Sequence, residues 1–308
     1  MSHIFEALQR AEAERSGGNV SKTPDSVADL LEQGFAREGE GTESASNRKS
    51  LAVVGGREAE TFSAAPTLSP APAPDSRLVC LTDQGSLAAE KFRVLGLRLR
   101  NLREKRKLKR IVVTSTIPEE GKSLTAANLA LNQARSKVLK ALLIDGDLRR
   151  PSLASGFGLR TSLPGLAECL LGERQLSEVV YKLNGTNLWF LPSGMPPENP
   201  LELMQSGRVA DLLDRLENFF DWVIIDSPPL IPLADTSYWM KQSDGVVMVV
   251  REGVTEKKSL KRALEIVDRS ALLGVVVNSC SSSDHKNYYQ RYGKVSGKPG
   301  DAPAVEND

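Results

Sequence analysis

Continuous apolar runs alternate with amphipathic segments over most of the chain after residue 110. The runs are IVVTS (111–115), ALLIDGD (141–147), LWFLPSG (188–194), WVIIDSPP (222–229), GVVMVV (245–250) and LGVVVNS (273–279). A strand that is buried on both faces has such a run, whereas a half-exposed antiparallel strand alternates between apolar and polar residues. The pattern therefore predicts a doubly wound α/β fold, in which helices cover both faces of a mostly parallel sheet.

The remaining segments predict a folded domain between an N-terminal region and a C-terminal tail that lack its pattern of buried strands. Residues 1–15 have apolar side chains at helical spacing and predict an amphipathic helix, which either packs on its own domain or docks on a partner. Residues 16–76 lose this periodicity and end in a proline-dense stretch, which predicts a disordered linker without helix or sheet. Leucines at helical intervals predict a long helix over 86–110. The folded domain is expected at 77–284 and a flexible tail at 285–308.

Charge and histidine content exclude several classes of protein. The 308 residues include 40 Lys and Arg against 39 Asp and Glu, so the net charge of +1 offers no general attraction to nucleic acid. The basic stretch at 103–110 is interpreted as the end of a helix, where cations are favourable. The two histidines, His3 and His285, are too few for histidine-rich zinc sites or for the HRD loop of eukaryotic-type kinases. Catalysis is left to carboxylates, lysine and a bound metal.

Cysteine content and hydropathy indicate the cellular location to expect. The three cysteines, Cys80, Cys169 and Cys280, are widely spaced and odd in number, which predicts no disulfide framework and favours a reducing, cytoplasmic location. No apolar run approaches the roughly 20 residues that cross a bilayer. The first residues also lack the apolar segment of a signal peptide. We therefore expect a protein that does not span a membrane by itself.

A candidate phosphate-binding loop follows the first apolar run. Ligands of doubly wound sheets bind at the carboxyl ends of the strands, so the residues after each run are the ones that matter for chemistry. Gly121, Lys122 and Ser123 supply a glycine that phosphate can approach, a lysine for the terminal phosphates and a hydroxyl for Mg²⁺. Thr116 stands where the usual G-x-x-x-x-G-K-[ST] pattern has its first glycine. The position between a buried strand and a helix strengthens the interpretation.

Carboxylates follow two further runs. Asp145 and Asp147 come at the end of the second run, with Arg149 and Arg150 just beyond them, and Asp226 follows the fourth run. Carboxylates in these positions suit Mg²⁺ and the acceptance of a proton, and arginine suits phosphate. Three strand ends thus each supply a component of a nucleotide and magnesium site.

The C-terminal segment holds three of the five tyrosines of the chain. Tyr288, Tyr289 and Tyr292 have polar and basic neighbours, whereas a buried aromatic cluster needs apolar ones. We therefore expect the tyrosines to be exposed on a flexible segment, where they could enter an active site as phosphoacceptors. The alternatives are a tail that docks on its own domain or a partner, and stacking on single-stranded nucleic acid.

Four segments together resemble one known family. TSTIPEEGKS resembles a Walker A box, LLIDGDLRRP the additional aspartate box called Walker A′, VIIDSPP a Walker B box, and PPENPLELM a proline-asparagine segment. Over about residues 78–292 the chain is similar to the bacterial tyrosine kinases of exopolysaccharide and capsule synthesis, a branch of the P-loop ATPases that also includes division and partition ATPases. Those ATPases carry an extra lysine where this chain has Ser115, Thr116 and Ile117, which favours the kinase branch.

The resemblance implies ATP and Mg²⁺ as cofactors and a role for each site residue. Lys122 is expected to contact the terminal phosphates, and Asp145 to accept the proton of a tyrosine hydroxyl. The expected metal residues are Ser123, Asp147 and Asp226. The expected nucleotide-binding residues are Thr116, Pro118, Glu119, Glu120, Gly121, Lys122, Ser123, Leu124 and Arg149. Because Glu119 and Glu120 would repel phosphate, we expect either that they point away or that the loop geometry differs.

The resemblance also implies partners. Relatives are activated by the cytoplasmic segment of a membrane chain-length regulator, so a separate regulator is expected to hold this chain at the inner face of the cell membrane. A cognate tyrosine phosphatase is implied as well. Relatives form rings through a Glu-x-x-Arg-x-x-Arg pattern, of which this chain has Glu90 and Arg93 but Gly96 in the third place, so a homo-oligomer stays open.

The expected function is an ATP-dependent protein-tyrosine autokinase that regulates exopolysaccharide or capsule polymerisation and export. One alternative is an ATPase of the partition and division type, which acts as a nucleotide-dependent assembly switch without kinase activity. Another is a scaffold that binds nucleotide without turnover.

Overall fold

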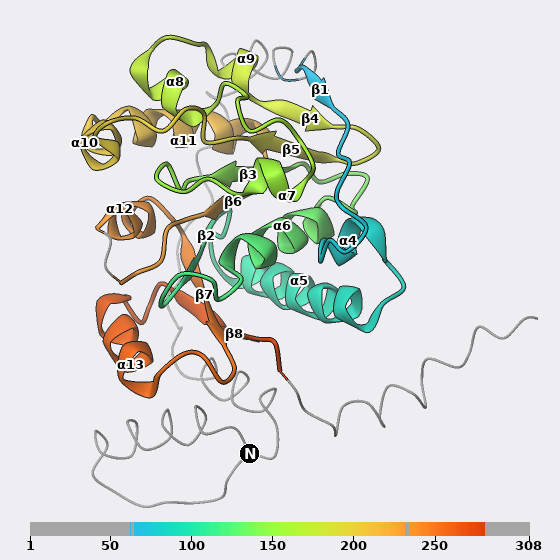
Figure 1. Ribbon diagram of the computed structural model, residues 1–308, viewed down its shortest axis with the longest axis vertical. Helices are drawn as coiled ribbons and strands as arrows, with labels where there is room; N and C mark the ends of the chain where they lie inside the picture. The colour runs from blue at the N-terminus through green and yellow to red at the C-terminus, as the bar shows by residue number, and fades with distance from the viewer. Residues whose placement is uncertain (1–61, 63–64, 232–233, 281–308) are drawn as a thin grey trace, which may run out of the picture.

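The structure, a computed structural model, describes Phe62, residues 65–231 and residues 234–280. These residues form an eight-stranded sheet in the order β1-β4-β5-β3-β6-β2-β7-β8 (Figure 1). The strands are β1 Thr67–Leu68, β2 Arg110–Ser115, β3 Ala141–Asp145, β4 Tyr181–Leu183, β5 Leu188–Leu191, β6 Trp222–Asp226, β7 Gly245–Arg251 and β8 Leu272–Asn278. All neighbouring strands are parallel except β4 and β5. The doubly wound, mostly parallel sheet is confirmed.

Helices cover both faces of the sheet because alternate side chains of the central strands point to opposite sides and both sets are buried. One face, which includes Val113 and Leu143, packs under four helices: α4 Val79–Thr82, α5 Leu87–Lys105, α6 Lys122–Gln133 and α7 Leu153–Gly156. The other face, which includes Val112 and Ile144, packs under α8 Leu166–Leu171, α9 Leu176–Val179, α10 Pro200–Gln205, α11 Arg208–Phe219 and α12 Asp235–Lys241. At the β8 edge, α13 Lys257–Ile266 covers this second face.

The long helix α5 lies close against α6 because Gly96 has no side chain. A Cβ at Gly96 would lie 2.2 Å from Oδ1 of Asn132 on α6, and the Gly96 carbonyl accepts a 3.2 Å hydrogen bond from Nε2 of Gln133. Gly96 therefore has a packing role in this helix.

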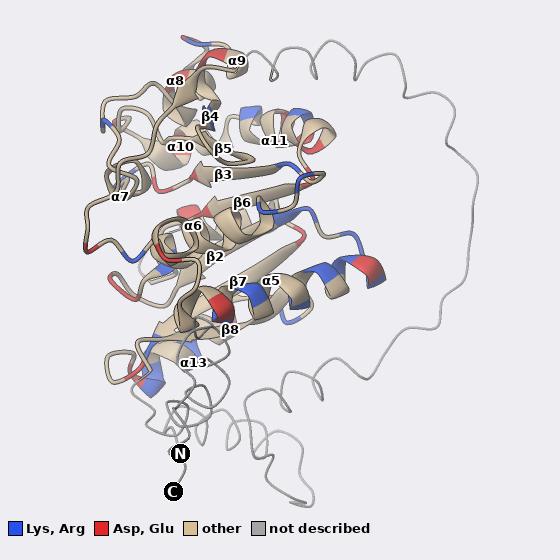
Figure 2. Ribbon diagram, turned by 90° about the vertical axis from the view of Figure 1, so that its right-hand side faces the viewer, with Lys and Arg blue, Asp and Glu red and all other residues tan. Residues whose placement is uncertain are grey.

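Charged residues form part of the exposed surface of α5. Glu90 and Arg93 form an ion pair with each other, and Figure 2 shows Lys and Arg recurring along the helix. The helix ends at Lys105 and not at residue 110 as predicted.

Part of the predicted linker belongs to the sheet. Thr67 and Leu68 form β1, which pairs with β4, and the carbonyl of Pro66 accepts a 2.9 Å hydrogen bond from the Lys182 N–H. The expectation of no sheet in this proline-dense stretch is therefore wrong at these two residues, because proline lacks only the N–H and is tolerated next to an edge strand. Phe62 is buried, and its ring contacts those of Phe219 and Phe220.

Other predictions about the ends of the chain lie outside the described residues. These include the amphipathic helix at 1–15, most of the linker and the tail at 285–308 with Tyr288, Tyr289 and Tyr292. The domain boundaries stay predictions. Among the helices that the structure describes, none combines the length and apolar character needed to cross a bilayer.

Candidate nucleotide site

The loop between β2 and α6 has the geometry of a phosphate-binding loop. Gly121 precedes the first residue of α6 and adopts φ +93°, a left-handed conformation that glycine tolerates without strain. A Cβ there would also lie 2.2 Å from Nδ2 of Asn278. The N–H groups of the first turn of α6 have no partners within the helix, so together with the helix dipole they favour an anion at this end.

A cavity of about 640 Å³ opens in front of this helix end. Its volume lies in the usual range for small-ligand sites, roughly 300–1,000 Å³. The lining residues come from the loop, the first turn of α6 and the segments after β3 and β6: Pro118, Glu119, Gly121, Lys122, Ser123, Leu124, Asp147, Arg149, Arg150, Ser152 and Pro229. The carboxyl ends of three parallel strands therefore contribute to one site, as expected for a doubly wound sheet.

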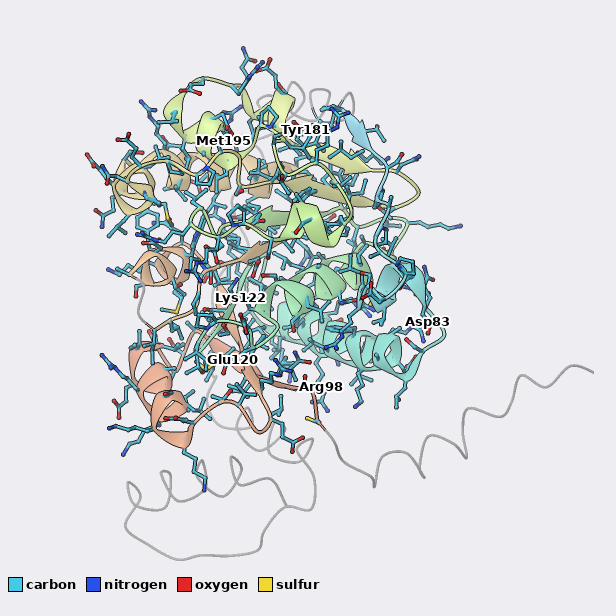
Figure 3. The ribbon with its side chains drawn as sticks, viewed as in Figure 1. Asp83, Arg98, Glu120, Lys122, Tyr181 and Met195 are labelled. Atoms are coloured by element: carbon cyan, nitrogen blue, oxygen red, sulfur yellow. The ribbon has the colours of Figure 1, made fainter. Side chains whose placement is uncertain are left out.

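Lys122 is the central cation of the site. It is labelled in Figure 3. Its Nζ lies 3.3 Å from Oδ2 of Asp147, 3.8 Å from Oδ1 of Asp226 and 3.1 Å from Oγ of Ser123. The Lys122 side chain is only 11% exposed, and the attraction of the aspartates outweighs burial, so its pKa is raised. The ammonium group is thus charged and close to where a terminal phosphate would sit.

Asp145 and Asp226 form a buried acidic pair behind Lys122. Burial, followed by repulsion from Asp226, raises the pKa of Asp145 to about 7. Burial also raises the pKa of Asp226, against the attraction of Lys122. One oxygen of Asp145 accepts hydrogen bonds from the N–H groups of Ser152 (3.2 Å) and Leu153 (3.1 Å). Asp145 does not line the cavity, whereas Asp147 does.

Gly146 allows the ends of β3 and β6 to approach each other. Its N–H donates a 2.8 Å hydrogen bond to the Asp226 carbonyl, and its own carbonyl accepts one of 3.1 Å from Nε1 of Trp239. A Cβ at Gly146 would lie 2.8 Å from the Asp226 carbonyl oxygen and 2.9 Å from the Trp239 ring. The spacing of the aspartates thus depends on glycine at this position.

The residues present fit a magnesium ion that is shared with nucleotide phosphates. Both carboxylate oxygens of Asp226 and Oδ1 of Asp145 are buried and lack a hydrogen-bond partner of ordinary geometry among the described residues. The described residues contain no group of three or more His, Cys, Asp or Glu that could enclose a metal. Mg²⁺ usually binds through one or two carboxylates, several waters and substrate phosphates, so a complete protein cage is not required. Ser123, Asp147 and Asp226 would hold it.

Comparisons with known proteins identify the family of the chain. A family model described as an AAA domain matches residues 109–271. Tyrosine-protein kinase YwqD of Bacillus subtilis is 35% identical over 213 residues, which cover 68% of this chain and 89% of that protein. The chain belongs to the bacterial tyrosine-protein kinases. Tyrosine-protein kinase CpsD of Streptococcus pneumoniae is 34% identical over 194 residues, 61% of the kinase described here and 85% of CpsD.

Solved structures lead to the same family. The crystal structure of the chimerical protein CapA2B2 matches this kinase with a TM-score of 0.64 and 32% identity, over 72% of this chain and 97% of that one. The kinase domain of the Escherichia coli tyrosine kinase ETK matches with a TM-score of 0.61 and 25% identity, over 65% of this chain and 79% of the ETK chain. The kinase therefore shares both sequence and fold with this group.

The structure separates the two loop glutamates of the kinase. Glu119 is exposed at the cavity and has φ +65°. Glu120 is fully buried and turns away from the cavity, where its carboxylate accepts hydrogen bonds from the Ile117 N–H at 2.9 Å and from the Thr255 hydroxyl. Glu120 thus shapes the loop from behind. Thr116 is also buried and does not line the cavity.

Arg149 of the kinase lines the cavity but is held by a partner that the sequence did not reveal. Its Nε and Nη2 donate to the two carboxylate oxygens of Asp235 at 2.6 and 3.2 Å. Asp235 begins α12, is 2% exposed and lies in no recognised motif. Such a two-bond pair fixes the plane of the guanidinium group beside the cavity.

Several further site residues of the kinase were missed. Ser152 lines the cavity, and the signal for it was its position shortly after the Walker A′ aspartates. Arg150, which was expected beside Arg149, lines the cavity as well. Asn278 could have been found by the same rule that selects residues at the ends of strands. Thr255 follows β7 by four residues and had no signal in the sequence.

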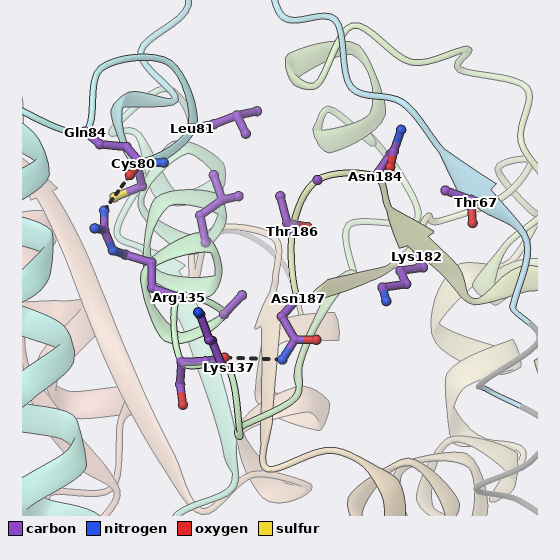
Figure 4. Close-up of a pocket in the computed structure, with 14 residues that line it drawn as sticks. Thr67, Cys80, Leu81, Gln84, Arg135, Lys137, Lys182, Asn184, Thr186 and Asn187 are labelled. Carbon is purple, nitrogen blue, oxygen red and sulfur yellow. Dashed lines mark hydrogen bonds between the residues drawn. The ribbon is translucent and has the colours of Figure 1, made fainter.

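A second cavity, of about 560 Å³, lies at the opposite end of α6 (Figure 4). Its lining includes Cys80, Arg135, Lys137 and Lys182, and Arg135 donates a 3.0 Å hydrogen bond to Oε1 of Gln84. Burial raises the pKa of the Cys80 thiol to about 11, so the thiol stays protonated. None of the predicted site residues that the structure describes lines this cavity.

Proposed function

We propose that this kinase transfers the γ-phosphoryl group of ATP to tyrosines of its own C-terminal tail, Tyr288, Tyr289 and Tyr292. The observation that carries the proposal is Lys122, a buried ammonium group held between Asp147 and Asp226 at the start of α6. In a bacterial tyrosine kinase, this arrangement would provide a cation and a helix N-terminus for the phosphate that is transferred. Such transfer depends mainly on positioning and on charge neutralisation.

Each residue of the site has a proposed task in the transfer. Lys122 neutralises charge on the terminal phosphates, and the N–H groups of Gly121 and the first turn of α6 bind phosphate oxygens. Ser123, Asp147 and Asp226 hold Mg²⁺, which when bound neutralises charge between the phosphates. Asp145 accepts the tyrosine proton, and its raised pKa makes it the stronger base. Since Asp145 is 1% exposed, this step requires the cavity to open toward β3.

The start of the tail supports an acceptor role for its tyrosines. The described chain runs from β8 to Cys280, and Asn278 at the end of β8 contacts the loop at Glu120. Tyr288 follows Cys280 by eight residues, which in extended form reach about 26 Å. This reach is comparable to the width of a small domain, so the tail could enter its own site or that of a second copy.

The proposed biological setting is exopolysaccharide or capsule polymerisation and export. The proposed partners are the cytoplasmic segment of a separate membrane chain-length regulator, which would hold the kinase at the inner face of the cell membrane, and a cognate tyrosine phosphatase. A homo-oligomer is proposed as well. The support is the family to which the chain belongs.

Labelling tests the proposed acceptors. The full chain is incubated with Mg²⁺ and ATP labelled on the γ-phosphate, and incorporation is compared with that of a triple variant, Tyr288→Phe, Tyr289→Phe and Tyr292→Phe. The wild type should be labelled and the triple variant should not. Tyr238→Phe is the matched control and should keep the label. Equal labelling of the triple variant would overturn the tail as acceptor.

A further inference from the structure

We propose that Asn278 is a positioning residue of the phosphate-binding loop. Its side-chain amide sets the orientation of the peptide between Glu120 and Gly121, and thereby directs the Gly121 N–H toward the nucleotide. The inference rests on the proposed function, because it assigns a task to that N–H in phosphate binding.

The first observation is the contact itself. Nδ2 of Asn278 donates a 2.9 Å hydrogen bond to the carbonyl of Glu120. The same atom would lie 2.2 Å from a Cβ built on Gly121. The amide of Asn278 therefore lies directly against the last peptide of the loop, on the side where β8 ends.

Because the peptide bond is planar, a contact that fixes the Glu120 carbonyl also fixes the direction of the Gly121 N–H. The C=O and N–H of a planar trans peptide point in opposite directions. A Glu120 carbonyl held toward Asn278 therefore leaves the Gly121 N–H directed away from β8. Gly121 and the two residues after it, Lys122 and Ser123, line the cavity. We infer that the Gly121 N–H is directed to this cavity. N–H groups directed in this way are what a phosphate loop uses to bind anions.

Asn278 is itself held in place. Its Oδ1 accepts a 2.9 Å hydrogen bond from the Ser279 N–H, which defines the side-chain oxygen and leaves the amide nitrogen facing the loop. Its backbone carbonyl accepts a 3.0 Å hydrogen bond from the Glu252 N–H. Residue 278 is also paired in the sheet with Arg251 of β7. The donor therefore has a defined position before any ligand binds, and such preorganisation lowers the cost of binding.

A different set of contacts fixes the rest of the loop. The Glu120 carboxylate joins the Thr255 hydroxyl to the Ile117 N–H at the beginning of the loop. These bonds involve the Glu120 side chain and do not include the peptide between Glu120 and Gly121. Among the hydrogen bonds of the described residues, the bond from Asn278 holds the carbonyl of that peptide. Its removal should therefore affect phosphate binding more than folding.

The test compares two asparagines that make the same kind of bond. Asn278→Ala removes the donor to Glu120. Asn187→Ala is the matched control, because Nδ2 of Asn187 donates to the carbonyls of Ser136 (3.3 Å) and Leu139 (2.8 Å), away from the nucleotide site. The dissociation constant of Mg²⁺–ADP is measured by titration calorimetry on the full chain, and the melting temperature is measured in parallel.

We expect Asn278→Ala to bind Mg²⁺–ADP about five- to tenfold more weakly, since a hydrogen bond contributes on this order. Asn187→Ala should bind as the wild type does, whatever its melting temperature. Asn278→Asp keeps the acceptor for Ser279 and removes the donor, so it should bind at least as weakly as Asn278→Ala. Asn278→Asp also replaces Asn278→Ala in the binding test if the alanine variant does not fold.

Wild-type affinity in Asn278→Asp or in folded Asn278→Ala would overturn the inference and leave the proposed function intact. Equal weakening in Asn187→Ala would also overturn it, because the effect would then be a general loss of stability. A wild-type chain that does not bind Mg²⁺–ADP would overturn the proposed function instead. The two failures are thus distinguishable.

Discussion

Asp145 and Asp226 are register partners on the adjacent parallel strands β3 and β6, and both are almost completely buried. Two carboxylates in this position repel each other, and burial adds to the cost of their charge. Lys122 lies against Asp226 at 3.8 Å and offsets part of that cost. The electrostatic energy of these buried carboxylates is therefore unfavourable in the absence of ligand, which is typical of a site that uses its charges for binding.

Removal of the Asp145 charge should change how stability depends on pH. The folded-state pKa of Asp145 is raised from 3.8 to about 7, so the unfolded chain loses this proton first and the free energy of unfolding falls between about pH 4 and 7. Asp145→Asn should make that fall smaller, since only the contribution of Asp226 then remains, and should be more stable than the wild type above pH 7 without Mg²⁺. Denaturant titrations at pH 5 and pH 8 measure the difference.

The matched control for this prediction is Asp268, whose pKa is lowered in the folded protein, whereas that of Asp145 is raised. Hydrogen bonds from Ser270 lower the pKa of Asp268, which is fully exposed, so its contribution is present above the ordinary pKa and lost as the pH falls. Asp268→Asn should therefore lose a little stability at pH 8. Parallel pH profiles for wild type and Asp145→Asn would contradict the prediction.

Lys122→Met should abolish catalysis and leave the fold intact. The ammonium group lies at the start of α6 and lines the cavity proposed for the phosphates, and loss of such a group costs about 100-fold or more in rate. Tyrosine phosphorylation is measured with phosphate-specific detection, and circular dichroism checks the fold. Lys137→Met, an exposed lysine at the second cavity, is the control and should keep full activity. Activity of Lys122→Met within tenfold of the wild type would be incompatible with the site.

Gly146→Ala should destabilise the protein. The new methyl group would lie within 3 Å of the Asp226 carbonyl oxygen and the Trp239 ring, and overpacking of this kind costs about 1–3 kcal/mol. Gly156→Ala is the control, because no atom lies within 4 Å of its Cβ position, and its change should stay within about 0.5 kcal/mol. Chemical denaturation compares the two. Equal stability of both variants would show that β3 and β6 can separate freely.

Arg149→Ala should cost more stability than Arg150→Ala. The first change leaves the buried carboxylate of Asp235 without its two hydrogen bonds, at a cost of about 1–3 kcal/mol. The side chain of Arg150 is exposed, so its removal should change the free energy of unfolding by less than about 0.5 kcal/mol. The comparison uses denaturation without nucleotide. A larger loss for Arg150→Ala would contradict the assigned pair.

The sequence predicted the central sheet well because its strands are buried on both faces. Runs such as IVVTS and WVIIDSPP are continuous in apolar residues for that reason, and each became a strand. The two strands it missed, β1 Thr67–Leu68 and β4 Tyr181–Leu183, are only two and three residues long. Strands this short leave no periodic pattern, so only tertiary pairing identifies them.

The site was predictable where function depends on residue type and order along the chain. Lys122, Asp147 and Asp226 meet because the ends of parallel strands lie at one edge of the sheet. Side-chain direction was not predictable, since one of the two donors that hold the Glu120 carboxylate inside the protein is Thr255, 135 residues later in the chain. Contacts between distant segments of this kind leave no local signal.

The central claim is that this chain phosphorylates its own tail. The most direct measurement is mass spectrometry of the full chain after incubation with Mg²⁺ and ATP, with release of free phosphate followed in the same sample. The account predicts phosphate on Tyr288, Tyr289 or Tyr292, and none in Lys122→Met. Release of free phosphate with an unmodified tail would contradict it and would indicate an assembly switch driven by ATP hydrolysis.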